Sequence, residues 1–170
     1  MKVLIMSDSH GLTHEINLIK ERHGHEVDAM IHCGDSELPM RATEMKGFLT
    51  VRGNCDYDEA YPDERLEEIG GLHFFVAHGH LYNVKMTLMN LAYKSEETNA
   101  DIVCFGHSHI AGSEMVDGTL FINPGSIRLP REIRDKTYVI LEHVNQETKV
   151  TFFNLAGNEI KNLSRTYQLG

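Results

Sequence analysis

Residues 3–10 read Val-Leu-Ile-Met-Ser-Asp-Ser-His, a short apolar run followed at once by an aspartate and a histidine. Such a run is typical of a buried strand, and carboxylate and imidazole groups are common metal ligands. The same pattern recurs four more times. The later blocks are Gly34-Asp35, Gly53-Asn54-Cys55-Asp56, His78-Gly79-His80 and Gly106-His107-Ser108-His109, after the apolar runs 29–33, 48–51, 72–77 and 102–105.

Two stretches between these runs, residues 13–22 and 85–98, carry apolar residues at helical spacing. Alternating strands and helices predict an α/β fold. After about residue 110 the pattern changes to strands joined by turns. The predicted strands are 113–116, 120–122, 138–144 and 149–153, with Asp117-Gly118 as one hairpin turn and residues 145–148 as a second. We expect one domain over residues 1–170, with the polar residues from about Gly157 loosely held.

The five polar blocks are expected to meet in space. In open α/β sheets the ligand crevice lies outside the carboxyl ends of the strands. A single block is more often a turn or a helix cap, but that interpretation does not explain why all five strand ends carry such residues. In extended backbone, residues i and i+2 point the same way, so Asp8 with His10, and His107 with His109, should each face one cleft.

Composition excludes several classes of protein. Lysine and arginine number 16 against 25 acidic residues, a formal charge of −9, so sequence-specific nucleic-acid binding is not expected. No apolar stretch is long enough to cross a bilayer, and the first apolar run is too short for a signal peptide. The three cysteines are widely spread and form no CxxC pair. We therefore expect no membrane partner and a reducing, cytoplasmic location.

The ordered set D-x-H, G-D, G-N-C-D, H-G-H and G-H-x-H resembles the signature of the calcineurin-like metallophosphoesterases. The resemblance covers residues 1 to about 126, including Asn123-Pro124-Gly125-Ser126, and is greatest to the small bacterial and archaeal phosphodiesterases. It implies an α/β fold built as a two-sheet mixed β-sandwich flanked by helices. It also implies a dinuclear metal centre at the strand ends.

The resemblance further implies a ligand for each metal position. One metal would take Asp8, His10 and His109, the other would take Asn54, His78 and His107, and Asp35 would bridge both. This imidazole, carboxylate and amide set suits two divalent ions. Manganese is the first choice from the resemblance, with nickel, zinc, iron and magnesium as alternatives.

The implied activity is hydrolysis of small phosphodiesters by a hydroxide that both metals hold, attacking phosphorus. Asp35 and Asn54 are the expected catalytic residues, and Asn54 and Arg128 the expected substrate contacts. Many relatives have a histidine in place of Cys55, where it is thought to assist the leaving group. Cysteine is a poorer proton donor, so the general acid stays open among Cys55, Asp56, His80, a metal-bound water or none.

Two other functions fit the same residues. The first is a non-catalytic protein-interaction scaffold, since the eukaryotic retromer contains a subunit with a similar fold, and fold alone does not imply function. The second is a phosphomonoesterase or nuclease of the same superfamily. Related small enzymes often form homo-oligomers, dimers or tetramers, and the sequence leaves this open.

Overall fold

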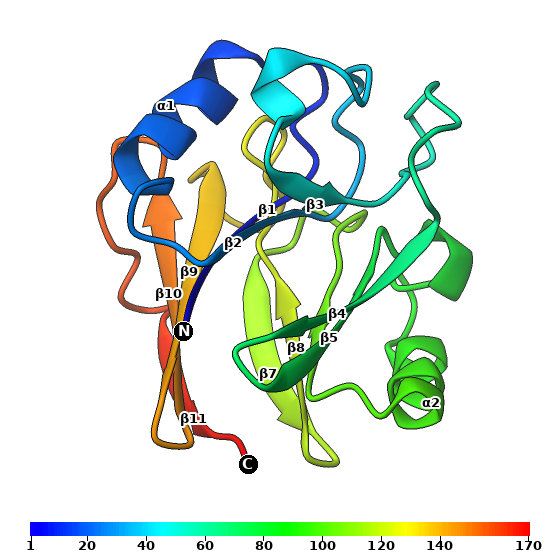
Figure 1. Ribbon diagram of the computed structural model, residues 1–170, viewed down its shortest axis with the longest axis vertical. Helices are drawn as coiled ribbons and strands as arrows, with labels where there is room; N and C mark the ends of the chain where they lie inside the picture. Colours follow the sequence, from blue (N-terminus) through cyan, green and yellow to red (C-terminus); the bar gives the residue numbers. More distant parts are fainter.

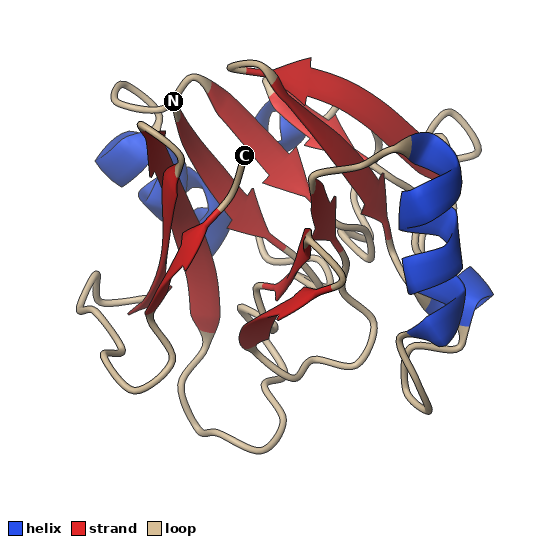
Figure 2. Cartoon of the chain, turned by 90° about the horizontal axis from the view of Figure 1, so that it is seen from below, coloured by secondary structure: helices blue, strands red, loops and turns tan.

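Two β-sheets face each other with a helix on each outer side in the computed structural model, which describes residues 1–170 (Figures 1 and 2). The first sheet has the strand order β11-β10-β9-β1-β2-β3 and the second has β4-β5-β6-β8-β7. The strands are β1 (Lys2–Met6), β2 (Ala29–His32), β3 (Phe48–Thr50), β4 (Glu64–Ile69), β5 (Leu72–Ala77), β6 (Ile102–Cys104), β7 (Gly112–Val116), β8 (Thr119–Asn123), β9 (Thr137–Val144), β10 (Glu147–Asn154) and β11 (Arg165–Gln168). The predicted α/β class and two-sheet sandwich are confirmed.

Side-chain alternation along the strands builds the core between the sheets. In β1, Val3 and Ile5 face the second sheet, while Leu4 and Met6 face outward. In β5, Phe74 and Val76 are the inward pair. Every residue of these two strands except Lys2 and His73 is buried, which explains why their sequences are largely apolar rather than alternating.

The outer faces are covered by helices. Helix α1 (His14–His23) packs Ile16 and Ile19 onto the first sheet, together with the 3₁₀ helix η1 (Thr43–Met45). Helix α2 (Met89–Thr98) packs Leu91 onto the second sheet, after the 3₁₀ helix η2 (His80–Tyr82). Neither α-helix has the length or apolar character required to span a membrane.

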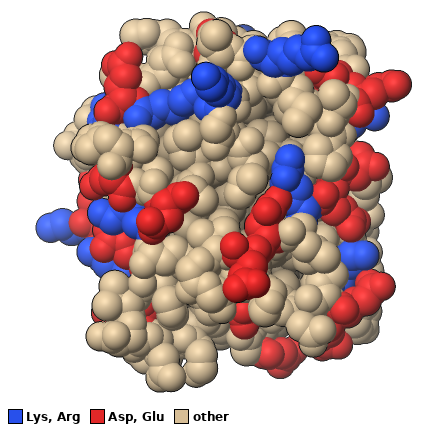
Figure 3. Space-filling model, viewed as in Figure 1, with Lys and Arg blue, Asp and Glu red and all other residues tan.

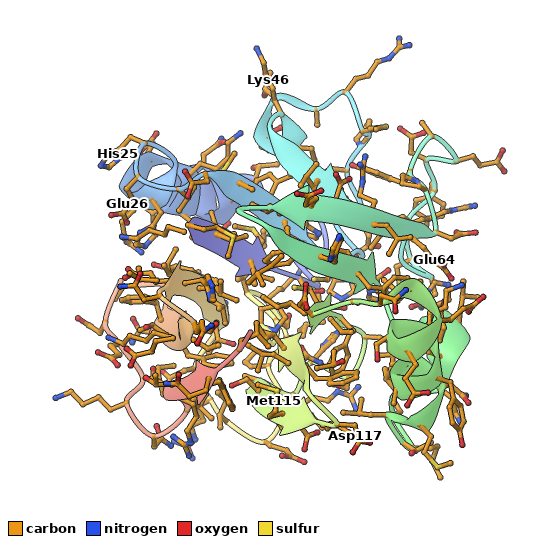
Figure 4. The ribbon with its side chains drawn as sticks, turned by 60° about the horizontal axis from the view of Figure 1, so that its bottom comes forward. His25, Glu26, Lys46, Glu64, Met115 and Asp117 are labelled. Atoms are coloured by element: carbon orange, nitrogen blue, oxygen red, sulfur yellow. The ribbon has the colours of Figure 1, made fainter.

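Most predicted elements are present, and three differ. The second helix begins at Met89 rather than near residue 85. Strand β4 was not predicted because its sequence is largely charged; it is an edge strand whose Glu64 lies beside α2 and pairs with Lys94 at 3.6 Å (Figure 4). The expectation of a loose end from about Gly157 is wrong: β11 pairs with β10, and Leu169 is buried.

Both predicted hairpin turns are confirmed. Asp117 and Gly118 have φ values of +48° and +86°, and Asn145 and Gln146 have +51° and +69°. Two consecutive positive φ angles are the geometry of the two-residue hairpin turn. Acidic and basic side chains alternate on the surface without a continuous basic area on the face that Figure 3 shows.

Candidate metal centre

The five polar blocks meet at one edge of the sandwich. Strands β1, β2 and β3 of the first sheet are parallel, as are β5 and β6 of the second, so their carboxyl ends share this edge. Hydrogen bonds join the blocks across the sheets. The His78 ring donates from Nδ1 to Cys33 O at 2.9 Å, and Gly106 N–H donates to His78 O at 3.0 Å.

One half of the cluster contains Asp8, His10 and His109. The His109 Nε2 atom lies 3.1 Å from Asp8 Oδ1, and the His10 Nε2 atom lies 3.8 Å from the same oxygen. The two Nε2 atoms are 3.3 Å apart. Three ligand-type atoms from β1 and β6 loops therefore surround one small volume.

The other half contains Asp35, Asn54, His78 and His107. The His78 Nε2 atom lies 3.2 Å from both Asp35 Oδ2 and Asn54 Oδ1. The His107 ring centroid is 5.1 Å from that of His78. The two halves are contiguous, because Asp35 Oδ2 also lies 4.0 Å from His10 Nε2. All seven predicted ligands are thus brought together, with Asp35 between the halves.

The convergence does not arise from extended backbone, so the expected i, i+2 geometry is wrong. Asp8 and His10 have φ values of +53° and +43°, and His107 and His109 have +69° and +60°. Asp35 also has a positive φ, +54°. Each such residue outside glycine costs on the order of 1 kcal/mol. Concentrating this strain at one cluster is typical of a functional site.

Three imidazoles are oriented by bonds on their far side. His10 Nδ1 lies 2.8 Å from Glu37 Oε2, and His109 Nδ1 donates to Leu129 O at 2.8 Å. His78 Nδ1 makes the equivalent bond to a carbonyl. A proton held at Nδ1 leaves a lone pair on Nε2, which is the arrangement of metal-binding histidines. Glu37 was not among the sequence-predicted residues; only its position two residues after Asp35 hinted at it.

These atoms fit divalent cations. Asp8 Oδ1 is fully buried and has no hydrogen-bond donor in the protein, although a buried carboxylate oxygen normally has a partner. The Nε2 atoms of His10 and His109 lie 3.8 and 3.1 Å from this oxygen and 3.3 Å from each other. A cation held among these three atoms would be a favourable partner for the carboxylate oxygen and for both ring nitrogens. Asp8, Asp35 and His78 form a second group whose ligand atoms all lie within 4.8 Å of one another.

The electrostatics of the cluster also favour added positive charge. Burial by itself would raise the pKa of Asp35, but the neighbouring His78 side chain offsets this and holds the pKa well below its usual value. The Asp8 carboxylate raises the pKa of His109. Protons and divalent ions compete for such sites, so the same field that retains a proton here would bind a metal.

Asp56 holds two of the ligand loops together. Its Oδ2 accepts N–H bonds from Asp35 at 2.8 Å and Gly53 at 2.7 Å, and its Oδ1 accepts from Glu37 N–H at 2.7 Å and Ser36 Oγ at 3.3 Å. The carboxylate is buried. Both oxygens are therefore engaged as acceptors, so the side chain joins residues 35–37 to Gly53.

His32 is a second support that the sequence did not reveal as functional. Its Nδ1 accepts the Gly34 N–H at 3.2 Å, so Nε2 carries the proton and donates to Ser9 Oγ at 2.9 Å. The ring thereby ties the Asp8-Ser9-His10 loop to the Gly34-Asp35 loop. The only sequence feature that points to this role is the position of His32 in an otherwise apolar strand. Burial lowers the pKa of His32 to about 4.

The low pKa of His32 predicts a pH-dependent stability. Between pH 6.5 and 4 the unfolded chain binds a proton at this residue and the folded protein does not. Stability from His32 is therefore complete above pH 6.5 and is lost as the pH falls, by up to about 3 kcal/mol. We expect metal-free wild-type protein to lose more unfolding free energy between pH 7 and 4.5 than His32→Gln, measured by urea denaturation. A control, exposed His25→Gln, should follow wild type; equal slopes for all three would contradict the assignment.

Two glycines allow the loops to approach the carboxylates closely. A Cβ on Gly53 would lie 2.0 Å from Asp35 Oδ1, and one on Gly106 would lie 2.1 Å from Ser7 Oγ and 2.5 Å from Asp8 Oδ2. Contacts this short are not tolerated. Glycine is therefore required at both positions by the proximity of the ligand side chains.

The remaining predicted residues lie around the cluster. Cys55 N–H donates to Asp35 Oδ1 at 2.8 Å, and burial raises the pKa of its thiol to about 11. His80 lies with its ring centroid 5.3 Å from that of His78, and its buried Nδ1 has no partner. Arg128 donates from its guanidinium to His10 O. Asn123 donates to Ser108 Oγ at 2.9 Å and so supports the β6 loop.

Two cavities adjoin this edge. One, of about 550 Å³, opens directly beside the cluster and has His10 in its wall. The other, of about 540 Å³, lies behind the β6 loop and is lined by Ser108, Phe105, Phe121 and neighbouring residues. It contains none of the seven predicted ligands. A phosphate in contact with the cluster would therefore extend into the first cavity.

Proteins of known family are similar to this chain in sequence. Residues 1–146 match the family model described as the calcineurin-like phosphoesterase superfamily domain. The chain is 52% identical over 169 residues to the probable metallophosphoesterase YsnB of Bacillus subtilis, which covers 99% of this chain and 100% of that protein. It is 33% identical over 144 residues to the phosphodiesterase MJ0936 of Methanocaldococcus jannaschii, covering 74% and 83% of the two chains.

Solved structures agree in fold. A conserved Streptococcus pneumoniae protein, described as a predicted phosphoesterase, superposes with a TM-score of 0.94 at 33% identity, covering 98% of this chain and 96% of that one. Vps29 from Entamoeba histolytica complexed with zinc has a TM-score of 0.74 at 19% identity, with coverage of 98% and 97%, which shows a shared fold alone. The family match over most of its length makes this chain a member of the calcineurin-like phosphoesterase superfamily.

Proposed function

We propose that the protein is a metal-dependent hydrolase of small phosphodiesters. The observation that carries the proposal is the buried, donor-free Asp8 Oδ1 faced by the two Nε2 atoms of His10 and His109. That arrangement supports the ligand set predicted from the sequence: Asp8, His10 and His109 for one ion, Asn54, His78 and His107 for the other, and Asp35 for both. Manganese stays the first choice, with nickel, zinc, iron and magnesium as alternatives.

The ions, when bound, supply an activated water for attack on phosphorus and positive charge for the non-bridging oxygens. The residues of the chain position the ions and the substrate. Asp35 holds both halves of the site in register, and Asn54 offers a neutral amide at the exposed side, where a phosphate enters. Glu37 fixes the tautomer of His10 through Nδ1. Asp56, with both oxygens occupied, is a positioning residue rather than an acid, which leaves Cys55 and His80 as candidates for proton donation within the protein.

Charge balance supports a diester as substrate. The cavity beside His10 offers one cation, Arg128, against one carboxylate, Glu37. A phosphodiester carries one negative charge and two organic groups. A phosphomonoester carries close to two negative charges and only one organic group. Apart from the metal ions, the wall of this cavity adds little net positive charge and leaves space for a second organic group, which suits the diester. The relative MJ0936, named a phosphodiesterase, agrees with this reasoning.

Hydrolysis of bis(p-nitrophenyl) phosphate and p-nitrophenyl phosphate by chelator-stripped protein tests the proposal. Each of manganese, nickel, zinc and magnesium is then added back. We expect turnover only with added metal, and a higher kcat/KM for the diester. A higher kcat/KM for the monoester would make the protein a phosphomonoesterase. Absence of turnover with every metal would favour the interaction scaffold.

A further inference from the structure

The cavity beside His10 has a wall chemistry that distinguishes it from a plain phosphate site. Its six lining residues are His10, Gly11, Glu37, Tyr57, Arg128 and Leu129. A volume of about 550 Å³ falls within the range of small-molecule sites, roughly 300–1,000 Å³. Because His10 belongs to the cluster and to this wall, a group bound here is next to the reacting phosphate. We call this cavity the His10 groove.

Tyr57 provides an aromatic face in the His10 groove. Its side chain is 88% exposed, although large aromatic side chains are usually packed against other residues. The backbone beneath it is firmly held, because the preceding residue, Asp56, accepts four hydrogen bonds from two separate segments, residues 35–37 and Gly53. A fixed backbone carrying an unpacked ring is suited to stacking on a planar ligand.

Glu37 and Arg128 supply the polar contacts. Glu37 uses Oε2 for His10, while its Oε1 has no protein donor and the side chain is 31% exposed. The carboxylate can therefore accept from a ligand hydroxyl. Arg128 is anchored by one Nη1 bond to His10 O, and its other N–H groups stay available. A base edge or a phosphate oxygen would accept from them.

We propose that the His10 groove binds a nucleoside esterified to the scissile phosphate, so that the substrates are small nucleoside phosphodiesters. The base would stack on Tyr57, a sugar hydroxyl would donate to Glu37, and Arg128 would contact the base edge or phosphate. Only one aliphatic side chain, Leu129, lines the groove, too little apolar surface for an acyl chain. The net charge of −9 and the single groove cation disfavour a long polynucleotide. This inference rests on the proposed phosphodiesterase function and names its substrate class.

Two diesters with the same leaving group test the groove. Thymidine 5′-(p-nitrophenyl phosphate) and methyl p-nitrophenyl phosphate differ only in the group that is retained. In each, water adds to phosphorus and the P–O bond to p-nitrophenolate breaks; thymidine 5′-phosphate or methyl phosphate and two protons are released. The ratio of their kcat/KM values with the manganese-loaded protein therefore reports recognition of the nucleoside rather than chemistry.

We expect the wild-type ratio to favour the thymidine ester by at least tenfold. Tyr57→Ala should lower the ratio about five- to tenfold, because base–aromatic stacking is worth about that much at an exposed ring. Tyr57→Phe should retain the ratio, since it keeps the ring. Tyr93→Ala, which removes another exposed tyrosine on α2, should leave it unchanged.

A second measurement works without turnover. In saturation-transfer NMR with thymidine 5′-phosphate and magnesium-loaded protein, the thymine protons should receive saturation in wild type and Tyr57→Phe but not in Tyr57→Ala. A wild-type ratio near one, or a ratio that Tyr57→Ala does not change, would overturn the groove assignment while leaving the phosphodiesterase intact. Failure to hydrolyse either ester would instead overturn the proposed function, and the NMR result alone would then decide whether the groove binds a nucleoside.

Discussion

Replacing Asp35 with asparagine is expected to lower kcat/KM for an aryl phosphodiester by roughly 10³-fold, on the order of 4 kcal/mol of transition-state stabilisation. Asp35 lies between the two halves of the cluster, 3.2 Å from His78 Nε2 and 4.0 Å from His10 Nε2. An amide of the same shape keeps the Cys55 N–H bond to Oδ1 but removes the negative charge that the two proposed cation positions would share. The measurement is steady-state hydrolysis of bis(p-nitrophenyl) phosphate with saturating manganese.

The matched control is Asp117→Asn (Figure 4), in the hairpin turn between β7 and β8, at the opposite end of β8 from Asn123, which supports the β6 loop. Asparagine tolerates the positive φ of that turn, so activity should equal wild type. Far-UV circular dichroism of Asp35→Asn should match wild type, which separates lost chemistry from lost fold. Wild-type turnover in Asp35→Asn would refute the proposed bridging role.

Asp56→Ala is expected to destabilise the protein by about 3–5 kcal/mol. The substitution leaves two buried backbone N–H groups, those of Asp35 and Gly53, and the part-buried N–H of Glu37 without an acceptor. A buried donor without a partner costs about 1–3 kcal/mol. The free energy of unfolding in urea measures the loss, with metal removed so that cation binding does not mask it.

Asp58→Ala is the control for that change. Asp58 also accepts two backbone N–H bonds, from Met40 and Ala60, but it does so at the surface, where water can replace it. The decrease in the free energy of unfolding should be clearly smaller for Asp58→Ala than for Asp56→Ala. If the free energy of unfolding of Asp56→Ala lies within about 1 kcal/mol of the wild-type value, the four hydrogen bonds to the Asp56 carboxylate do not stabilise the site.

The elements that the sequence predicts best are the strands that are buried on both faces. Strand β5 matches the predicted run 72–77 at both ends, because five of its six residues are apolar, which is typical of a buried strand. Strands β4 and β11 were missed because edge strands need little apolar surface. Their pairing depends on the neighbouring strand rather than on their own composition.

At the candidate metal centre, too, residue types are predictable from the sequence, whereas contacts between distant segments are not. The residues of the cluster are visible in the sequence because all five strand ends carry ligand types together. The way they converge is not visible: Asp8, His10 and three other predicted ligands have positive φ angles, and backbone hydrogen bonds such as Asp8 N–H to Gly34 O join loops that are distant in sequence. Glu37 and His32 act through contacts across the fold, so their roles required coordinates.

The central claim is that seven side chains from five loops bind a pair of divalent cations around Asp35. Anomalous X-ray scattering from crystals of manganese-loaded protein tests it most directly. We predict two anomalous peaks flanking the Asp35 carboxylate, about 3.5–4 Å apart, one beside Asp8, His10 and His109 and the other beside Asn54, His78 and His107. No peak at this edge of the sandwich, or a single peak without contact to Asp35, would contradict the account.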